Sequence, residues 1–473
     1  MQVQFMKTLV VIASYGTGND EYLHKVVRSY RAMPFAIDIV IVSNVTKSVP
    51  SGVELVTGQP TRNPHSLPFA HRKVMADRVA DYDLFIYSED DILITEDNIR
   101  SFLRVSDLLP DHLLAGLMRY EVGARGDRYF PEVHNRFHWD PCSVISVHGH
   151  TFAYFNNEHA GCYIVTRDQL ERAIATGNFL VSPHEGKYGM LETASTDIYT
   201  QCGFRKVLCI SHLQDFLVHH LPNKYLDTLG TKAVEVERQL LALLSTSENP
   251  NSMPFLVDTR AEHKSWPFAA NYYEPARSDF ITHVPPHART ILSIGCGWGA
   301  TEEALIRSGI RVYAVPLDPI ISACAEARGV EVLNGRLDAV LDQVNSIRFD
   351  CVLLSNVLHL VPDPQFLLAS VAKVLNEGAV VIAAVPNLRN ARVLWRSLRR
   401  DPYYVALGSF QESGVHLTTK RVLQNWLGHA GLQVQQVMPV FLNGPHLRKL
   451  HRSPLGVFNS LFTSEFVMVA QKA

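Results

Sequence analysis

The sequence predicts an α/β protein of two domains, each built on a mainly parallel sheet covered by helices. The chain has 473 residues, more than one compact domain normally holds. Strand-like apolar runs alternate with helical patterns in both halves. A stretch rich in Ser, Asn and Pro, residues 246–264, separates the halves. We therefore expect a first domain over 1–228, a helix and linker over 229–265, and a second domain over 266–473.

The composition limits the partners and the compartment. Apolar residues make up 47% and charged residues 19%, so a large core can form. A net charge of −2 gives no reason to expect nucleic acid as a partner. Seven cysteines without a Cys-x-x-Cys pair favour a reducing compartment. No secretory signal or membrane-spanning run is evident, so we expect a cytoplasmic protein; the pattern indicates no oligomeric state.

The first half begins with a strand–helix–strand unit. Residues 7–14 and 37–44 read as buried strands, and residues 21–33 between them have helical spacing. Such a unit pairs its strands in parallel through a right-handed crossover. Ligands bind beyond the carboxyl ends of such strands, so Ser14 and Tyr15 are candidate contacts for a nucleotide base and ribose.

An acidic cluster ends the next buried strand. Apolar residues fill 84–87, and Glu89, Asp90 and Asp91 follow. Adjacent carboxylates repel one another, and they become tolerable near apolar residues when a divalent cation lies among them. We expect Mn²⁺ or Mg²⁺ at Asp91 and Glu89, with Glu89 and Asp90 near the nucleotide. The alternative is a solvated turn before a helix capped by Thr95.

The stretch after that helix, residues 119–151, reads as irregular and is rich in aromatic and histidine residues. Long loops of this kind are usually functional or disordered. We expect either a wall that stacks on sugar rings or a loop packed on the sheet by its own rings. His148 and His150 are a minor candidate for a metal site.

A strand that runs into an acidic cluster resembles the Asp-X-Asp motif of GT-A glycosyltransferases, here in a Glu-Asp-Asp form. The resemblance covers residues 7–225, and its individual motifs are short. It implies a nucleotide-diphosphate sugar donor, a metal that neutralises the leaving diphosphate, and a glycan or lipid-linked glycan acceptor.

The same resemblance assigns roles to polar residues further along. Residues 64–83 contain a helix that carries Arg72 and Lys73, which we expect either to reach the diphosphate or, at least as readily, to form a solvated basic face. In residues 190–199, Asp197 is the first choice and Glu192 the second for the general base, unless either caps a helix. A later histidine completes the metal shell in that family, and imidazole suits Mn²⁺. The candidates for this ligand are His212, His219 and His220.

The second half opens with a strand over 290–294 that runs into Gly295, Gly297 and Gly299 before a helix. Glycines in this position let the backbone approach a cofactor. The motif resembles motif I of class I S-adenosylmethionine-dependent methyltransferases, and the later strands of that Rossmann-like fold follow in order over 268–471. The resemblance implies S-adenosylmethionine as cofactor, with Asn356 among its contacts.

The second half departs from that family at positions that usually carry acids. Ser293 stands before the glycines, and Pro316 stands where a carboxylate would hold the ribose hydroxyls. Asp318 lies on the same side as Pro316 if the strand continues, and is the candidate substitute. His359 is a candidate general base, with a buried core histidine as the alternative. The domain is therefore either an active methyltransferase or a non-catalytic binding or docking module.

Residues 388–401 carry five arginines among apolar residues at near-helical spacing. This segment fits either peripheral contact with the inner face of a membrane or a cap over the cofactor pocket. Taken together, the sequence predicts a glycosyltransferase that also methylates a sugar hydroxyl in surface glycan synthesis. The alternative is a glycosyltransferase with a non-catalytic second domain.

Overall fold

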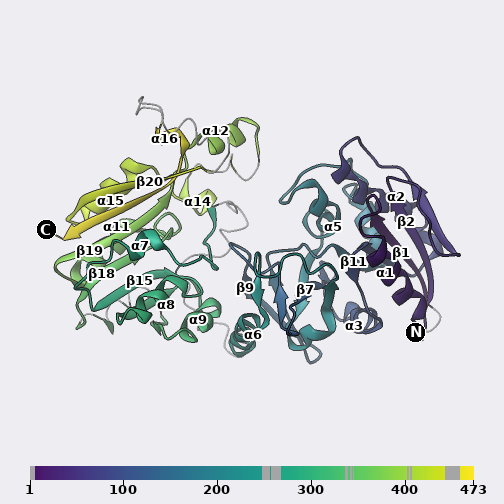
Figure 1. Cartoon of the computed structure of the whole chain (residues 1–473), viewed down its shortest axis with the longest axis horizontal. Coiled ribbons are helices and arrows are strands. Elements are labelled where there is room, and N and C mark those ends of the chain that lie inside the picture. Colours follow the sequence, from purple (N-terminus) through teal and green to yellow (C-terminus); the bar gives the residue numbers. More distant parts are fainter. Residues whose placement is uncertain are drawn as a thin grey trace. The chain divides into compact units, whose positions relative to one another are not determined.

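Contacts in a computed structural model divide the chain into two compact units, Met1–Glu248 and Asn249–Ala473 (Figure 1). The helix expected before the linker lies in the first unit, so that unit extends past residue 228. Most of the expected linker lies outside the described residues. No described helix has the length and apolar character needed to span a bilayer. The structure describes residues 6–247, 256, 268–335, 339–340, 343–344, 346–401, 404, 407, 409–442 and 459–472.

The first unit is centred on a five-stranded sheet in the order β11-β4-β1-β2-β3. The first four strands in sequence pair in parallel, and β11 runs antiparallel to β4. Ala13 pairs with Glu89, so the carboxyl ends of β1 and β4 lie side by side. This register brings the loop after β1 to the acidic cluster. The strands are β1 (Lys7–Ser14), β2 (Ala36–Ser43), β3 (Val53–Thr57), β4 (Leu84–Glu89) and β11 (Cys162–Thr166).

The helices of the first unit follow the expected pattern. The side chain of Thr95 caps α3 by accepting a hydrogen bond from the backbone N–H of Asn98. The side chain of Asn98 in turn accepts one from the backbone N–H of Thr95. Thr166 caps α4 in the same way with Gln169. The helices are α1 (Asp20–Ala32), α2 (Ala70–Asp77), α3 (Glu96–Ser106), α4 (Arg167–Ala175), α5 (Met190–Thr200) and α6 (Ala233–Ser247), with 3₁₀ segments at Pro64–Phe69, Val79–Asp81 and Ile210–Phe216.

The prediction of an irregular stretch over 119–151 is wrong, because this part of the chain supplies strands to two further sheets. Their orders are β6-β12-β10-β9 and β14-β8-β7-β13-β5. Trp139 and Phe155 pack with ring centroids 4.9 Å apart, so the aromatic residues fill a core between strands. The strands are β5 (Ile92–Leu93), β6 (Leu113–Ala115), β7 (Met118–Val122), β8 (Arg128–Phe130), β9 (Trp139–Val147), β10 (His150–Phe155), β12 (Arg205–Cys209), β13 (Leu217–His220) and β14 (Thr231–Lys232).

The second unit has one seven-stranded sheet in the order β17-β16-β15-β18-β19-β21-β20, and β21 is antiparallel to both neighbours. The order reverses between β15 and β18, which is where ligands bind in Rossmann-like sheets. This confirms the predicted fold of the second half. The strands are β15 (Thr290–Cys296), β16 (Arg311–Pro316), β17 (Glu331–Val332), β18 (Phe349–Leu354), β19 (Leu375–Pro386), β20 (Leu432–Phe441) and β21 (Thr463–Lys472).

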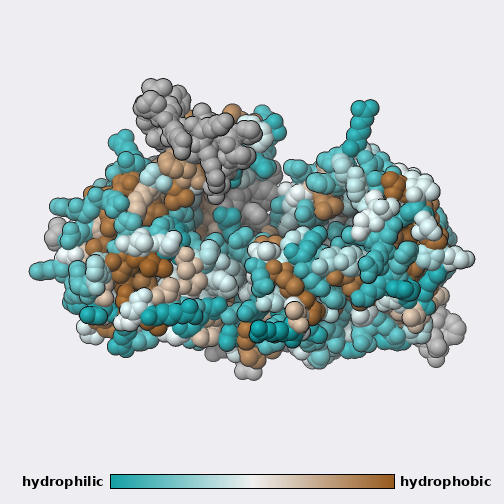
Figure 2. Space-filling model, viewed as in Figure 1, coloured by the Kyte–Doolittle hydropathy of each residue, from teal (hydrophilic) through white to brown (hydrophobic). Residues whose placement is uncertain are grey.

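Helices alternate with the strands of this sheet along the sequence. Figure 2 shows one face of the molecule, on which the described surface is mostly hydrophilic and apolar residues form scattered groups. Among the exposed apolar side chains, Trp395 and Leu398 both lie on α12. The helices are α7 (Ser278–Ile281), α8 (Ala300–Arg307), α9 (Pro319–Glu326), α11 (Pro364–Val374), α12 (Ala391–Leu398), α14 (Phe410–Ser413), α15 (Lys420–His429) and α16 (Asn459–Phe462).

Candidate functional site

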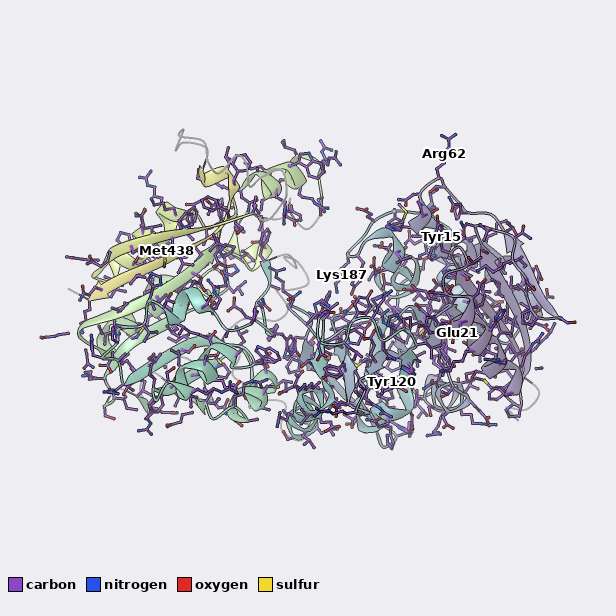
Figure 3. All side chains as sticks on the ribbon, viewed as in Figure 1. Tyr15, Glu21, Arg62, Tyr120, Lys187 and Met438 are labelled. Atoms are coloured by element: carbon purple, nitrogen blue, oxygen red, sulfur yellow. The ribbon has the colours of Figure 1, made fainter. Side chains whose placement is uncertain are left out.

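The acidic cluster of the first unit is buried at the carboxyl end of β4. Asp90 and Asp91 are each 5% exposed. Ser14 Oγ donates to Asp90 Oδ2 at 2.6 Å, and Asn19 Nδ2 donates to Asp90 Oδ1 at 2.8 Å. Asp90 therefore fastens the loop after β1 to the end of β4. Tyr15, labelled in Figure 3, lies in that loop, and 53% of its surface is exposed. Asn19 is a contact that the sequence did not reveal.

Asp91 meets His220, as the sequence predicted for one histidine. His220 Nε2 lies 3.4 Å from Asp91 Oδ2, and His220 Nδ1 lies 2.5 Å from Glu121 Oε1. We assign the Nδ1 proton to the bond with Glu121, because an ionised carboxylate only accepts. Nε2 and the Asp91 oxygen then face each other as two acceptors, and this arrangement needs a proton or a cation between them.

These residues fit a divalent cation. Among the described residues, Asp91 Oδ1 and Glu89 Oε1 are buried without a hydrogen-bond partner. Glu121 orients the histidine ring as a carboxylate does behind a metal-bound imidazole. Asp91 and His220 would be ligands, and Glu89 supplies further negative charge. Glu121 is a second residue that the sequence did not reveal.

Burial governs the protonation of the cluster. It raises the pKa of Glu89 to about 8, and the charge of Asp91 adds to this effect. It also raises the pKa of Asp90 to about 6, against the hydrogen bonds from Ser14 and Asn19. Burial acts in the same direction on Asp91, but a hydrogen bond and a charge interaction with His220, which require a proton on Nε2 in place of a cation, lower the pKa overall. Protons would therefore compete with any metal ion that binds this cluster.

His219 is not part of this cluster, so its prediction as a metal ligand is wrong. Its ring stacks on Tyr120 with centroids 5.0 Å apart, and its Nε2 lies 3.1 Å from Asn223 Oδ1. Adjacent residues of a strand point to opposite faces, which separates His219 from His220 on β13. The sequence gives the pair but not the face that each one takes.

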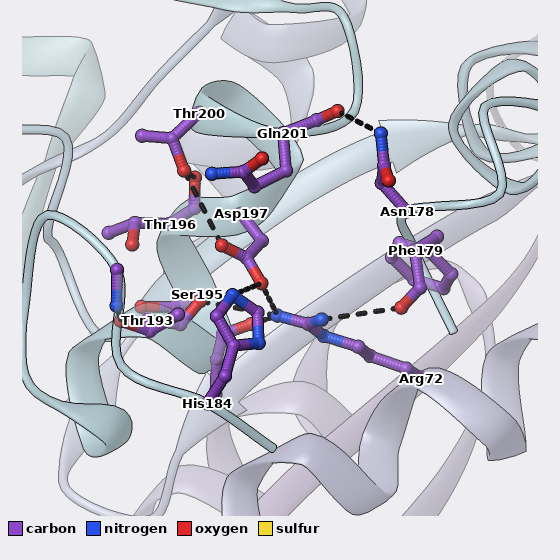
Figure 4. A network of polar contacts seen from close by, with 12 residues as sticks. Arg72, Asn178, Phe179, His184, Thr193, Ser195, Thr196, Asp197, Thr200 and Gln201 are labelled. Atoms are coloured by element: carbon purple, nitrogen blue, oxygen red, sulfur yellow. Dashed lines mark hydrogen bonds and ion pairs between the residues drawn. The ribbon is translucent and has the colours of Figure 1, made fainter. Parts of the chain in front are cut away.

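Arg72 and Asp197 pair with each other inside the first unit (Figure 4). Arg72 Nη2 lies 3.0 Å from Asp197 Oδ2, and both side chains are almost fully buried. Arg72 also donates to the backbone carbonyls of Phe179, Thr193 and Ala194. The predictions of Arg72 as a diphosphate contact and Asp197 as the general base are therefore wrong.

Glu192 takes a different position from Asp197. It lies in the first turn of α5 and is half-exposed, whereas Asp197 lies in the buried later part. Burial is the main cause of the raised pKa of Glu89, and the charge of Glu192 contributes to it. Glu192, the second choice from the sequence, is thus the carboxylate of α5 that interacts with the acidic cluster.

The second unit has a cleft, open to solvent, at the carboxyl end of β15. The predicted glycines and Asn356 all line it. Glu274, Glu302 and Ser355 are further polar residues of the lining that the sequence analysis did not single out. The cleft is lined by Ala270, Asn271, Glu274, Phe280, Ser293, Gly295, Cys296, Gly297, Trp298, Gly299, Ala300, Thr301, Glu302, Leu317, Leu353, Ser355 and Asn356.

The glycines of the cleft are required by close packing of the chain on itself. A Cβ on Gly297 would lie 2.4 Å from the carbonyl oxygen of Tyr272, and one on Gly295 would lie 2.7 Å from Val357 Cβ. Gly299 has φ +87°, a conformation that L-residues rarely adopt. These contacts hold the turn between β15 and α8 in the form that leaves the cleft open.

A polar network closes one side of the cleft. Ser355 Oγ donates to Glu274 Oε2 at 2.7 Å, and Arg277 bridges Glu274 and Glu465. Asn356 Nδ2 donates to Glu465 Oε2 at 2.5 Å. Burial raises the pKa of Glu274, and the charge of Arg277 opposes this. The network fixes the side chains that follow β18.

The lining residues fit S-adenosylmethionine. Among the described residues, Asn271 Oδ1 and Asn356 Oδ1 are buried without a hydrogen-bond partner. These two acceptors match the ammonium and adenine amino groups of the cofactor, which donate hydrogen bonds. Ser293 Oγ donates to Glu302 Oε1 at 2.6 Å. Glu302 therefore brings a carboxylate to the position where the sequence showed Ser293 instead of an acid.

Two predictions for the second unit are wrong. Asp318 caps α9 by accepting from the amides of Ile320 and Ile321, and it does not line the cleft. His359 is buried and its Nε2 lies 2.9 Å from the carbonyl oxygen of Phe268, so it is a core histidine rather than a base. Each of these two residues forms hydrogen bonds that stabilise the local structure, as buried polar side chains commonly do.

Comparisons with known proteins agree with this cleft. A family model described as a methyltransferase domain matches residues 240–437. The chain is 30% identical over 173 residues to the ubiquinone biosynthesis O-methyltransferase of Xylella fastidiosa, covering 34% of this chain and 69% of that protein. It is 33% identical over 130 residues to the mitochondrial ubiquinone biosynthesis O-methyltransferase of Schizosaccharomyces pombe, covering 25% and 47%.

Among solved structures, a SAM-dependent methyltransferase from Archaeoglobus fulgidus aligns at 19% identity with a TM-score of 0.32. That alignment covers 41% of this chain and 90% of the other. The match of the family model leaves residues 1–239 outside it.

Proposed function

Because the chain belongs to the S-adenosylmethionine-dependent methyltransferases through its C-terminal unit, we propose that it methylates a hydroxyl oxygen. The relatives named O-methyltransferases support an oxygen acceptor. S-adenosylmethionine would supply the methyl group from its sulfonium sulfur, which leaves as a neutral thioether. Asn271 and Asn356 would accept hydrogen bonds from the bound cofactor, and Glu274 and Glu302 would provide negative charge in the cleft for a cationic ligand.

We further propose that the first unit binds a nucleotide-diphosphate sugar through Mn²⁺ or Mg²⁺. The observation that carries this proposal is the contact between Asp91 and His220, with Glu121 behind the imidazole. The metal would neutralise the leaving diphosphate. Glu192 then replaces Asp197 as the candidate that deprotonates an acceptor hydroxyl, because Asp197 is occupied by Arg72.

The combined activity fits surface glycan synthesis. The first unit adds a sugar to a glycan or lipid-linked glycan, and the second methylates a sugar hydroxyl of the product. Tethering two consecutive steps in one chain raises the effective concentration of the intermediate. The surface of α12 supports a lipid-linked acceptor. Leu398 is 84% exposed, and Arg399 stacks on Trp395, so an apolar and basic surface is available to the inner face of a membrane.

The second candidate function is a methyltransferase whose first unit does not transfer a sugar. The burial of Asp197 in an ion pair favours it, because the first choice of general base is lost. In this case the first unit binds a nucleotide-sugar without turnover and presents it, or its glycan, to the second unit.

Thermal unfolding of the full chain with Mn²⁺ and either UDP or GDP tests the metal and nucleotide site. We expect stabilisation that needs both the metal and one nucleotide, and that Asp91→Asn abolishes. Glu171→Gln, an exposed acid on α4, is the matched control and should keep the response. Equal stabilisation of the wild type and Asp91→Asn would remove the metal role from this cluster. Hydrolysis of an added UDP-sugar or GDP-sugar by the full chain with Mn²⁺ separates the two candidate functions.

A further inference from the structure

We propose that the first unit has a second metal site, of the zinc class, formed by His150, Cys209 and His212. Each residue offers one ligand atom, and the three atoms lie within 4.8 Å of one another. No member of this group contacts the acidic cluster in the hydrogen bonds and ion pairs of the described residues. The inference stands whether or not the first unit binds a nucleotide-sugar.

The topology of one sheet brings the three residues together. Strands β10 and β12 are antiparallel neighbours, with Phe152 opposite Cys209. The start of β10 therefore lies beside the end of β12. His148 and Gly149 have φ of 47° and 81°, the pattern of a tight two-residue hairpin turn that places His150 at the start of β10.

His212 is placed by a break in the helical segment after β12. It follows Cys209 by three residues and has φ −138° and ψ 40° inside the segment Ile210–Phe216. This kink carries its ring to a centroid distance of 5.0 Å from the ring of His150. Non-helical backbone at this position is what allows Cys209 and His212 to face the same point.

The distances approach those of a tetrahedral site. Zn–S and Zn–N bonds of about 2.3 and 2.0–2.1 Å place neighbouring sulfur and nitrogen ligands about 3.6 Å apart. Cys209 Sγ lies 3.9 Å from His150 Nδ1. Small side-chain rotations close this difference, since His212 is exposed and His150 is half-buried.

The hydrogen bonds leave the correct nitrogen free. Thr151 N donates to Ser211 Oγ, and Ser211 Oγ lies 2.9 Å from His212 Nδ1. Ser211 therefore fixes the ring of His212 and leaves its Nε2 as the ligand, as partners behind metal ligands commonly do.

The ligand types also indicate which metal would bind. One sulfur and two nitrogen ligands select Zn²⁺ over Mg²⁺ or Mn²⁺, and water completes the open side. The ion would tie the β9–β10 hairpin to the end of β12.

Titration of the chelator-treated full chain with Co²⁺ tests the site, because thiolate-to-cobalt charge transfer gives a near-ultraviolet band only where a cysteine binds. We expect one equivalent of this band, displaced by Zn²⁺. It should be lost in Cys209→Ser, and the apparent Co²⁺ affinity should fall at least about tenfold in His212→Ala, since a ligand is removed.

Matched controls separate this site from its surroundings. Cys202→Ser removes another buried thiol of the same unit, and His148→Asn changes the hairpin turn while tolerating its φ. Both should keep the band, and so should Asp91→Asn. A band that is absent from the wild type, or that survives Cys209→Ser, overturns the proposal. If Cys209→Ser does not fold, His212→Ala at an exposed position decides, and unchanged affinity there also overturns it.

Discussion

The candidate site of the first unit is made of charged side chains from distant segments, whereas the cleft of the second is shaped by the glycine turn after β15. Asp91 meets His220, and Arg72 meets Asp197, each across more than a hundred residues of sequence. The glycines that shape the cleft all fall within 295–299. A site made of paired charges fails when one partner is lost, and a site made of backbone fails mainly when a side chain is added.

The largest effect should follow from breaking the buried ion pair of the first unit. Arg72→Met leaves the Asp197 charge buried and should destabilise this unit by about 3–5 kcal/mol. Denaturant-dependent hydrogen exchange measures each unit separately, with peptides of β4 and α5 for the first and of β15 for the second. The double variant Arg72→Met/Asp197→Leu should recover much of the loss. Equal loss in the single and double variants would contradict an ionic origin.

Removing the carboxylate behind the imidazole should weaken the metal site without removing a ligand. Glu121→Gln should lower Mn²⁺ affinity by about 10–100-fold, as is typical for partners of metal ligands. Isothermal titration of the full chain with Mn²⁺ measures this. His219→Gln on the opposite face of β13 is the control and should bind as the wild type does. The reverse ranking would place the metal on the other face.

In the second unit, a single polar change should have a smaller effect than in the first. Asn271→Ala removes one unpaired acceptor of the cleft and should lower affinity for S-adenosylmethionine by about tenfold, the value of one hydrogen bond to a charged group. Calorimetric titration gives the affinity, and Asn223→Ala, in the first unit, is the control. An unchanged affinity of Asn271→Ala for S-adenosylmethionine would show that Asn271 does not contact the cofactor.

The raised pKa values of the acidic cluster predict a pH dependence with a definite sign. Glu89 (about 8) and Asp90 (about 6) hold protons in the folded chain that the unfolded chain has already released. The metal-free first unit should therefore lose stability as the pH rises from about 4 to about 8. Mn²⁺ replaces these protons, so its stabilising effect on Tm should be larger near pH 8 than near pH 6. Glu89→Gln should flatten this difference.

The smallest effect on stability should come from α12. Trp395→Ser with Leu398→Ser exposes no new core, so stability should change by no more than about 0.5 kcal/mol. Sedimentation with vesicles rich in anionic lipid should nevertheless decrease. Leu241→Ser, an exposed apolar residue of the first unit, is the control. If the double variant binds the vesicles as strongly as the wild type does, α12 does not contact the membrane.

Local signals made the second unit predictable. The strand, the glycines and the helix after them follow one another in sequence, so their geometry follows from a few dihedral angles. Asp318 shows the limit of this reasoning. The sequence places Asp318 two residues after Pro316 and suggested it as a substitute for the missing acid. Only the structure shows that its carboxylate caps α9.

The first unit was harder to predict because its contacts are non-local. The central strands were predicted, with β1 at its observed residues, and the acidic cluster was placed at the end of β4. The ion-pair partner of each charged residue was not predicted. Nothing near Arg72 in the sequence indicates that its side chain points toward α5 and away from a diphosphate. The strands between 118 and 155 were missed because turns at 123–127 and 148–149 divide this stretch into short segments.

The position of His219 and His220 on β13 has a consequence for how this segment can change. Inserting one residue between β12 and β13 would shift the strand by one position, so that His219 would take the place of His220 beside Asp91. Deleting one residue would instead bring Leu221 to that place and remove the imidazole. Length, more than composition, is therefore the property that variants of this segment should keep.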